Sequence, residues 1–149
     1  MMWLKQRPGI LPAGATRTLS RATDRFKVVA LDTLAGSVVT LPPAIGYGDE
    51  YEFIITVLAT TNSHIIKVQN ATDVFRGVVM CLDSNLATVN MFGFVPGATG
   101  DTITLDRTNT GSVSLGEWLV VKDVAAGIWH VRGMLSGLAP ATPFSATVS

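Results

Sequence analysis

The chain has 149 residues and a formal net charge of zero, and 48% of its residues are hydrophobic against 15% charged. This length accommodates one domain with a hydrophobic core. Its apolar runs fall well short of the ~20 residues that cross a bilayer as a helix. Neither a membrane span nor a secretory signal is therefore expected. The high apolar content predicts burial in a dense core or between subunits.

The first 25 residues differ in charge from the rest of the chain. They hold five basic residues and one acidic residue, whereas residues 26–149 hold six basic and ten acidic residues. Pro and Gly at positions 8, 9, 12 and 14 interrupt any regular element. Residues 1–25 are therefore predicted to form an extended basic N-terminal arm outside the core, either a solvated tail or a segment that orders against a protein partner. Its candidate contact residues are Trp3, Leu4, Arg7, Ile10, Leu11, Arg17 and Arg21.

From Phe26 onward, short runs of β-branched and aromatic residues are separated by Gly, Pro, Asn and Asp, which is typical of strands and turns. Within residues 51–57, large apolar side chains occupy alternate positions and would share one face of a strand. Residues 34–36 suit a hairpin turn between the first two of these strands. The predicted strands are 26–32, 37–41, 51–58, 64–69, 74–82, 88–94, 101–105, 118–121 and 128–135.

No long window of the sequence has the 3.6-residue period of an amphipathic helix. Together with the regular turn signals, this predicts an all-β fold, an antiparallel β-sandwich or barrel with jelly-roll character, over residues 26–135. Residues 136–149 are rich in Gly, Ala, Pro, Ser and Thr. They are expected to form an extended C-terminal tail, either loose or laid against a neighbouring subunit.

Residue types that bind metals are sparse. Cys81 is the only cysteine, lies in an apolar run and is expected to be buried in the core. His64 and His130 each lie inside a predicted strand, with no Cys or carboxylate at ligand spacing. We therefore predict no metal site at either histidine.

The acidic residues also lack the spacing of a catalytic or calcium-binding site. Asp49, Glu50 and Glu52 could be weighed as a glycosidase pair, but neighbouring strand residues point to opposite faces, and Asp49 is expected in a solvated, Gly-flanked turn. Residues 101, 106 and 109 do not have the spacing of a calcium loop. The chain is predicted not to be an enzyme and to use no cofactor. Because the body of the chain is acidic, direct nucleic-acid binding by the arm is not expected.

Read in order, motifs over residues 31–82 and 99–149 resemble small virion proteins of tailed bacteriophages. The resemblance covers about two thirds of the chain or more, and it is the order and spacing of the motifs that make it specific. The motifs are LDTLAGSVVTLP (31–42), GYGDEYEF (46–53), TNSHIIKV (61–68), ATDV (71–74), GDTITL (100–105), GEW (116–118), GIWHVRG (127–133) and ATPFS (141–145).

The resemblance implies a capsid decoration (cement) protein that is made in the host cytoplasm and resides on the capsid surface of the virion. It further implies the major capsid protein as partner and self-association as a homo-oligomer, often a trimer. It supplies no catalytic or ligand residues, and residues 1–25 lie outside it. Two alternatives stay open: a tail- or fibre-associated virion protein or receptor- or glycan-binding module, and a carboxylate-based glycan hydrolase.

Overall fold

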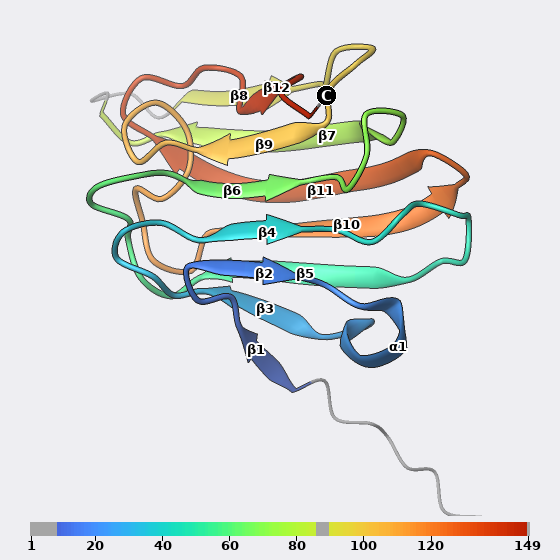
Figure 1. Cartoon of the computed structure of the whole chain (residues 1–149). Coiled ribbons are helices and arrows are strands. Elements are labelled where there is room, and N and C mark those ends of the chain that lie inside the picture. Colours follow the sequence, from blue (N-terminus) through green and yellow to red (C-terminus); the bar gives the residue numbers. More distant parts are fainter. Residues whose placement is uncertain (1–8, 86–89, 149) are drawn as a thin grey trace, which may run out of the picture.

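The computed structural model describes residues 9–85 and 90–148, which form two β-sheets packed face to face (Figure 1). The seven-stranded sheet has the order β1-β3-β5-β10-β11-β7-β8, and the five-stranded sheet has the order β12-β9-β6-β4-β2. The elements are β1 (Ile10–Pro12), β2 (Thr16–Thr18), α1 (Arg21–Asp24), β3 (Val28–Leu31), β4 (Val38–Thr40), β5 (Glu50–Ile55), β6 (His64–Lys67), β7 (Val74–Asp83), β8 (Asn90–Phe94), β9 (Thr102–Leu105), β10 (Trp118–Ala125), β11 (Ile128–Gly137) and β12 (Phe144–Ser145). The predicted all-β sandwich is confirmed, and the described strands do not close into a barrel.

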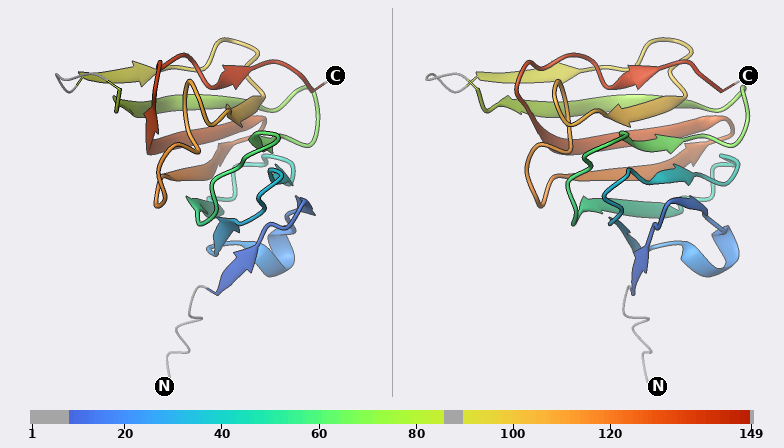
Figure 2. Two further views of the ribbon diagram at one scale, coloured as in Figure 1. Left: turned by 90° about the vertical axis from the view of Figure 1, so that its left-hand side faces the viewer. Right: turned by 60° about the vertical axis from the view of Figure 1, so that its left-hand side comes forward.

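The first six strands alternate between the two sheets, so the chain winds around the core two strands per turn (Figure 2). Successive strands of one sheet therefore run in the same direction: β1, β3 and β5 are parallel in one layer, and β2, β4 and β6 in the other. Both sheets are mixed, not antiparallel as predicted. Residues 34–36 consequently connect β3 to β4 across the sandwich and do not form a hairpin.

The core lies between the sheets and follows the predicted alternation. In β5, Tyr51, Phe53 and Ile55 are buried, and in β11 the buried side chains include Trp129. The rings of Tyr51 and Trp129 pack with their centroids 5.9 Å apart. Cys81 is fully buried, as predicted. Each such large apolar side chain contributes about 1.5–3 kcal/mol through burial.

Residues 10–24 belong to the sandwich, which corrects the prediction that the first 25 residues lie outside the core. β1 adds to the edge of one sheet and β2 to the edge of the other. Between and after these strands, Ala13 and Leu19 reach the hydrophobic core. Pro12 is tolerated because β1 is an edge strand, where a missing N–H leaves no ladder bond unmade. The helix α1 has four residues, and no helix in the described ranges is long and apolar enough to cross a membrane.

The C-terminal residues also join the fold. β11 continues to Gly137, and β12 pairs with β9 through Phe144 and Ser145. The Phe144 ring packs against Phe75, with centroids 6.5 Å apart. Part of the predicted C-terminal tail, residues 136–149, thus belongs to the two sheets.

Candidate functional site

A buried ionic cluster ties the N-terminal segment to the seven-stranded sheet. Helix α1 directs Arg21 toward two carboxylates, and its Nη1 atom lies 3.0 Å from Asp123 Oδ2 and 2.5 Å from Asp49 Oδ2. Arg21 Nη2 also donates to the Pro43 carbonyl at 2.6 Å. The predicted solvated position of Asp49 is wrong, because Asp49 is 1% exposed and its charge is balanced by Arg21.

Asp123 is the centre of this cluster. Its carboxylate accepts the backbone N–H groups of Ile45, Gly46 and Tyr47 at 3.1, 2.6 and 3.2 Å. Burial alone would raise the pKa of Asp123, but these three donors and Arg21 outweigh it and hold the pKa below its usual range. The ionised form of Asp123 thus organises the turn that precedes β5.

The cluster is poorly suited to glycoside hydrolysis. A glycosidase needs one carboxylic acid whose pKa is raised so that it can donate a proton, whereas the pKa of Asp123 is lowered. Glu50 and Glu52 are half-buried on the opposite face of β5 from the buried Asp49 and so do not converge with it. The arrangement acts as a structural clamp.

His64 is also engaged inside the protein. Its Nδ1 atom accepts the Ser37 N–H at 3.0 Å, and its Nε2 atom lies 2.9 Å from the Val57 carbonyl oxygen. These partners require the neutral tautomer with the proton on Nε2. Burial lowers the pKa of His64, more than the hydrogen bond to Val57 raises it.

This histidine predicts a stability change between about pH 5 and 7. Below about pH 6.5, the usual pKa of histidine, the unfolded chain takes up a proton that folded His64 resists. The free energy of unfolding should therefore fall as the pH is lowered through this window. Urea unfolding from pH 7.5 to 5 should show the fall, and His64→Gln should flatten it although it lowers stability overall. His130→Gln is the control. An equal flattening by His130→Gln would contradict the assignment to His64.

Asp101 and Asp106, which were considered for a calcium loop and not predicted to form one, are hydrogen-bonded within the chain. Asp101 accepts the Thr102 hydroxyl and the N–H groups of Thr147 and Val148. Asp106 caps the turn that follows it, with the Asn109 N–H 2.7 Å from Oδ1. Across residues 9–85 and 90–148, no three His, Cys, Asp or Glu side chains gather so that they could hold a metal ion.

The outer face of the seven-stranded sheet is divided into a charged half and an apolar half. In the charged half, Glu50 pairs across strands with Lys122, Lys122 with His130, and His130 with Arg76. Glu50 also lies 4.0 Å from a nitrogen of Arg132. The exposed ion pair of Glu50 and Arg132 contributes under about 1 kcal/mol, and the charged side chains keep this half hydrated.

The apolar half lies over β10, β11, β7 and β8. Trp118 pairs across strands with Met134, Met134 with Met80, and Leu82 with Met91. Val78 lies next to them and is 46% exposed, while Trp118, Met134 and Met91 are 38%, 41% and 50% exposed. We call this surface the apolar patch: Val78, Met80, Leu82, Met91, Trp118 and Met134.

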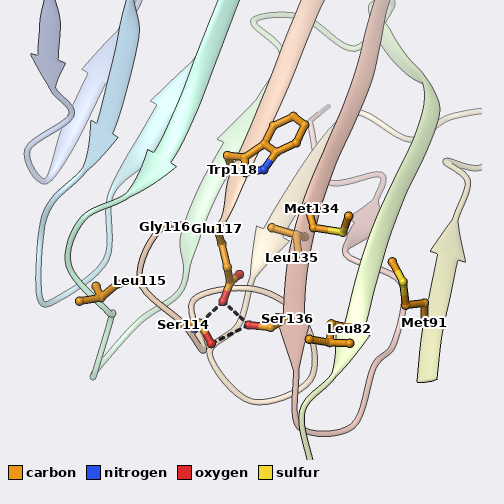
Figure 3. A pocket seen from close by; sticks show the side chains of 10 residues that line it. All are labelled: Leu82, Met91, Ser114, Leu115, Gly116, Glu117, Trp118, Met134, Leu135 and Ser136. Carbon is orange, nitrogen blue, oxygen red and sulfur yellow. Dashed lines mark hydrogen bonds between the residues drawn. The ribbon is translucent and has the colours of Figure 1, made fainter. Parts of the chain in front are cut away.

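A hollow of about 400 Å³ opens in the apolar patch (Figure 3). Trp118, Met134, Met91 and Leu82 line it together with Glu117. The Glu117 carboxylate accepts the Ser136 hydroxyl at 2.7 Å, and also three backbone N–H groups, from residues 112–114. Glu117 therefore fixes the loop before β10. This loop lies beside the apolar side chains that line the hollow.

The sequence contained a partial signal for this patch. A strand with one solvated face normally alternates apolar and polar residues, whereas residues 78–82 and 118–121 are apolar at every position. That pattern indicates strands covered on both faces. It does not reveal that β7, β8, β10 and β11 are neighbours in one sheet, which depends on the topology.

The residues predicted to contact a capsid are distributed differently. Trp3, Leu4 and Arg7 lie outside the described residues. Ile10 is 71% exposed, Leu11 packs against the core, and Arg17 donates to the Pro12 carbonyl and lies 3.9 Å from Asp24. Arg17 and Arg21 thus have partners in their own chain. The sequence could not show this, because the Arg21 partners lie 28 and 102 residues away.

No protein-family model, no curated protein and no solved structure matches the chain.

Proposed function

We propose that the chain is a structural virion protein, a capsid decoration (cement) protein that binds the major capsid protein on the outer surface of a phage head. The observation that carries the proposal is the apolar patch, in which Trp118, Met134, Val78 and Met91 are each more than a third exposed. Contiguous exposed apolar surface with a polar surround is typical of protein-binding sites. The motif resemblance of residues 31–82 and 99–149 supplies the capsid as the partner.

The physical role follows from where the protein binds. A protein that binds only the assembled shell stabilises it by mass action, without any reaction. The apolar patch would supply the buried centre of the contact, and the charged half of the same face would form its hydrated rim. Trp118 is the natural anchor, since tryptophan is enriched among the residues that dominate interface energies.

The N-terminal residues extend this proposal. Trp3, Leu4 and Arg7, together with the exposed Ile10, stay as proposed capsid contacts. Leu11, Arg17 and Arg21 are left out. Leu11 packs against the core, and the two guanidinium groups bind the protein's own carbonyl and carboxylate oxygens. The resemblance also makes self-association, as a trimer, part of the proposal, with no cofactor, membrane or nucleic acid involved.

Replacing Trp118 with lysine tests the patch. Loss of a central interface anchor costs about 2 kcal/mol or more, roughly a 30-fold weaker affinity. We expect Trp118→Lys to weaken binding to heads assembled without this chain by at least that factor, measured by co-sedimentation over a concentration series. Val124→Lys is the matched control, because Val124 lies on the same strand, is 49% exposed and is outside the patch. Full occupancy by Trp118→Lys, with its fold intact by circular dichroism, would exclude the patch as the capsid contact.

A receptor- or glycan-binding module of the tail is the second candidate. It is favoured by the Trp118 indole at an open hollow (Figure 3), since flat aromatic rings with a polar edge suit mixed polar and apolar ligands. The isolated protein would then bind a glycan or a cell surface without any capsid. A decoration protein binds assembled heads and leaves cell surfaces free.

A further inference from the structure

The outer edge of the seven-stranded sheet at β8 has the properties of a strand that pairs with another chain. β8 pairs with β7 on one side, and no described segment pairs with its other side (Figure 1). Its sequence, Asn-Met-Phe-Gly-Phe, has no charge and no proline. Met91 and Phe92 are 50% and 41% exposed, and Val95 just beyond is 66% exposed.

The other sheet edges lack this combination. β1 and β2 are three residues long and contain Pro12 and Arg17, and β12 has two residues. Short strands, prolines and charges are the features by which proteins prevent edge-to-edge pairing. Among the described edges, β8 is the longest and carries none of them, so its free backbone N–H and C=O groups are available as a template.

We propose that β8 pairs antiparallel with β8 of a second copy of this chain, about a two-fold axis that passes through Phe92. The strand is complementary to itself in this register. Each Met91 lies opposite Gly93 of the other copy, so a large side chain occupies the space that a glycine leaves on the outer face. The two Phe92 rings meet on the inner face, as a cross-strand aromatic pair.

The faces of β8 are consistent with this arrangement. Phe92 is the register partner of the buried Cys81 and so points toward the five-stranded sheet, whereas Met91 is the partner of Leu82 and points outward. A two-fold axis perpendicular to the sheet keeps like faces together and joins the two seven-stranded sheets into one. The absence of charge in β8 means that no like charges meet across the axis.

The contact is small and its strength is limited accordingly. Two five-residue strands bury less than the roughly 1,200–2,000 Å² of a stable interface. We therefore expect association in the micromolar to millimolar range. Being two-fold, it would double the mass of whatever unit the chain otherwise forms, and it does not depend on the proposed capsid role.

Cysteine cross-linking tests both the contact and its register. In a Cys81→Ala background, which removes the thiol facing position 92, Phe92→Cys should form an intermolecular disulfide under mild oxidation, because residues on the axis face their own copies. Asn90→Cys should not, since residue 90 would face residue 94. Cross-linking of Asn90→Cys in preference to Phe92→Cys, or of neither at millimolar protein, would overturn the proposal.

Sedimentation velocity over a concentration series gives a second readout in the native chain. Phe92→Lys should weaken the doubling of mass at least tenfold, because two like charges would face each other on the axis. Ile10→Lys, on the opposite edge of the same sheet, is the control and should leave it unchanged. Undiminished doubling by Phe92→Lys would place the contact elsewhere. Phe92 points away from the apolar patch, so unchanged head binding by Phe92→Lys keeps this result separate from the capsid proposal.

Discussion

Asp123→Asn is expected to lower the free energy of unfolding by about 3 kcal/mol or more, the range found when one partner of a buried ion pair is removed. The asparagine would retain one acceptor oxygen, but its NH₂ group would face backbone N–H groups that Asp123 now accepts, from Ile45, Gly46 and Tyr47. Arg21 would lose one of its two carboxylates. Chemical denaturation at pH 7 measures the loss.

The matched control is Glu50→Gln on the neighbouring strand. Glu50 is half-exposed and lies 4.0 Å from Arg132, a type of surface pair that contributes at most about 1 kcal/mol. A loss of similar size in the two variants would mean that the Arg21–Asp123 clamp contributes no more than a surface contact.

The same clamp sets the direction of an acid effect. Because the pKa of Asp123 is lowered in the folded protein, the ionised carboxylate stabilises the fold above about pH 3.9, the usual aspartate pKa. That contribution is lost as the pH falls from there through the folded pKa. Asp106 acts in the same direction, because its lowered pKa adds to the slope. Asp123→Asn should therefore reduce the acid sensitivity without abolishing it.

Most strands could be located from the sequence because a strand of four or more residues leaves a visible run of β-branched and aromatic side chains. β5 and β11 are examples, in which every second residue from Tyr51 and from Trp129 faces the core. β1, β2 and β12 were missed because they have two or three residues and lack the run of three consecutive β-branched side chains that indicated β4, which is equally short. Their strand character comes from pairing with β3, β4 and β9, which is a property of the folded chain.

Strand direction was predicted less well for a topological reason. A short connection such as residues 34–36 is compatible with a hairpin or with a crossing between layers, and the local residues suit both. The crossing occurs because Leu31 and Val39 both point into the core from opposite sheets. Because each of the first six strands changes layer, β1, β3 and β5 run parallel in one sheet and β2, β4 and β6 in the other.

The candidate site was only partly predictable, for a related reason. The apolar runs at residues 78–82 and 118–121 indicate more apolar surface than one core face needs. Their assembly into the apolar patch requires β11 to lie between β10 and β7, and β7 is parallel to β11 although far from it in the chain. The Arg21 clamp was not predictable at all, since nothing near Arg21 in the sequence identifies Asp123.

Gly77→Ala is expected to lower the free energy of unfolding, measured by chemical denaturation, by about 4 kcal/mol or more. A loss of this size is exceptional for a single substitution. Gly77 has φ +130°, which side-chain-bearing residues rarely adopt, and a Cβ atom there would lie 2.0 Å from the Val131 carbonyl oxygen. Gly77 and Val131 are register partners in the parallel β7–β11 pair, and Val131 is fully buried. Neither backbone can move without separating the two strands that carry Met80 and Met134 of the apolar patch.

Gly97→Ala is the matched control, because nothing lies within 4 Å of a Cβ atom at that position. Its free energy of unfolding should stay within about 0.5 kcal/mol of the parent value, as for most surface substitutions. If Gly77→Ala is instead tolerated as well as Gly97→Ala, the close parallel contact of β7 and β11 is wrong. The neighbourhood of Met80 and Met134, on which the apolar patch depends, would then be wrong with it.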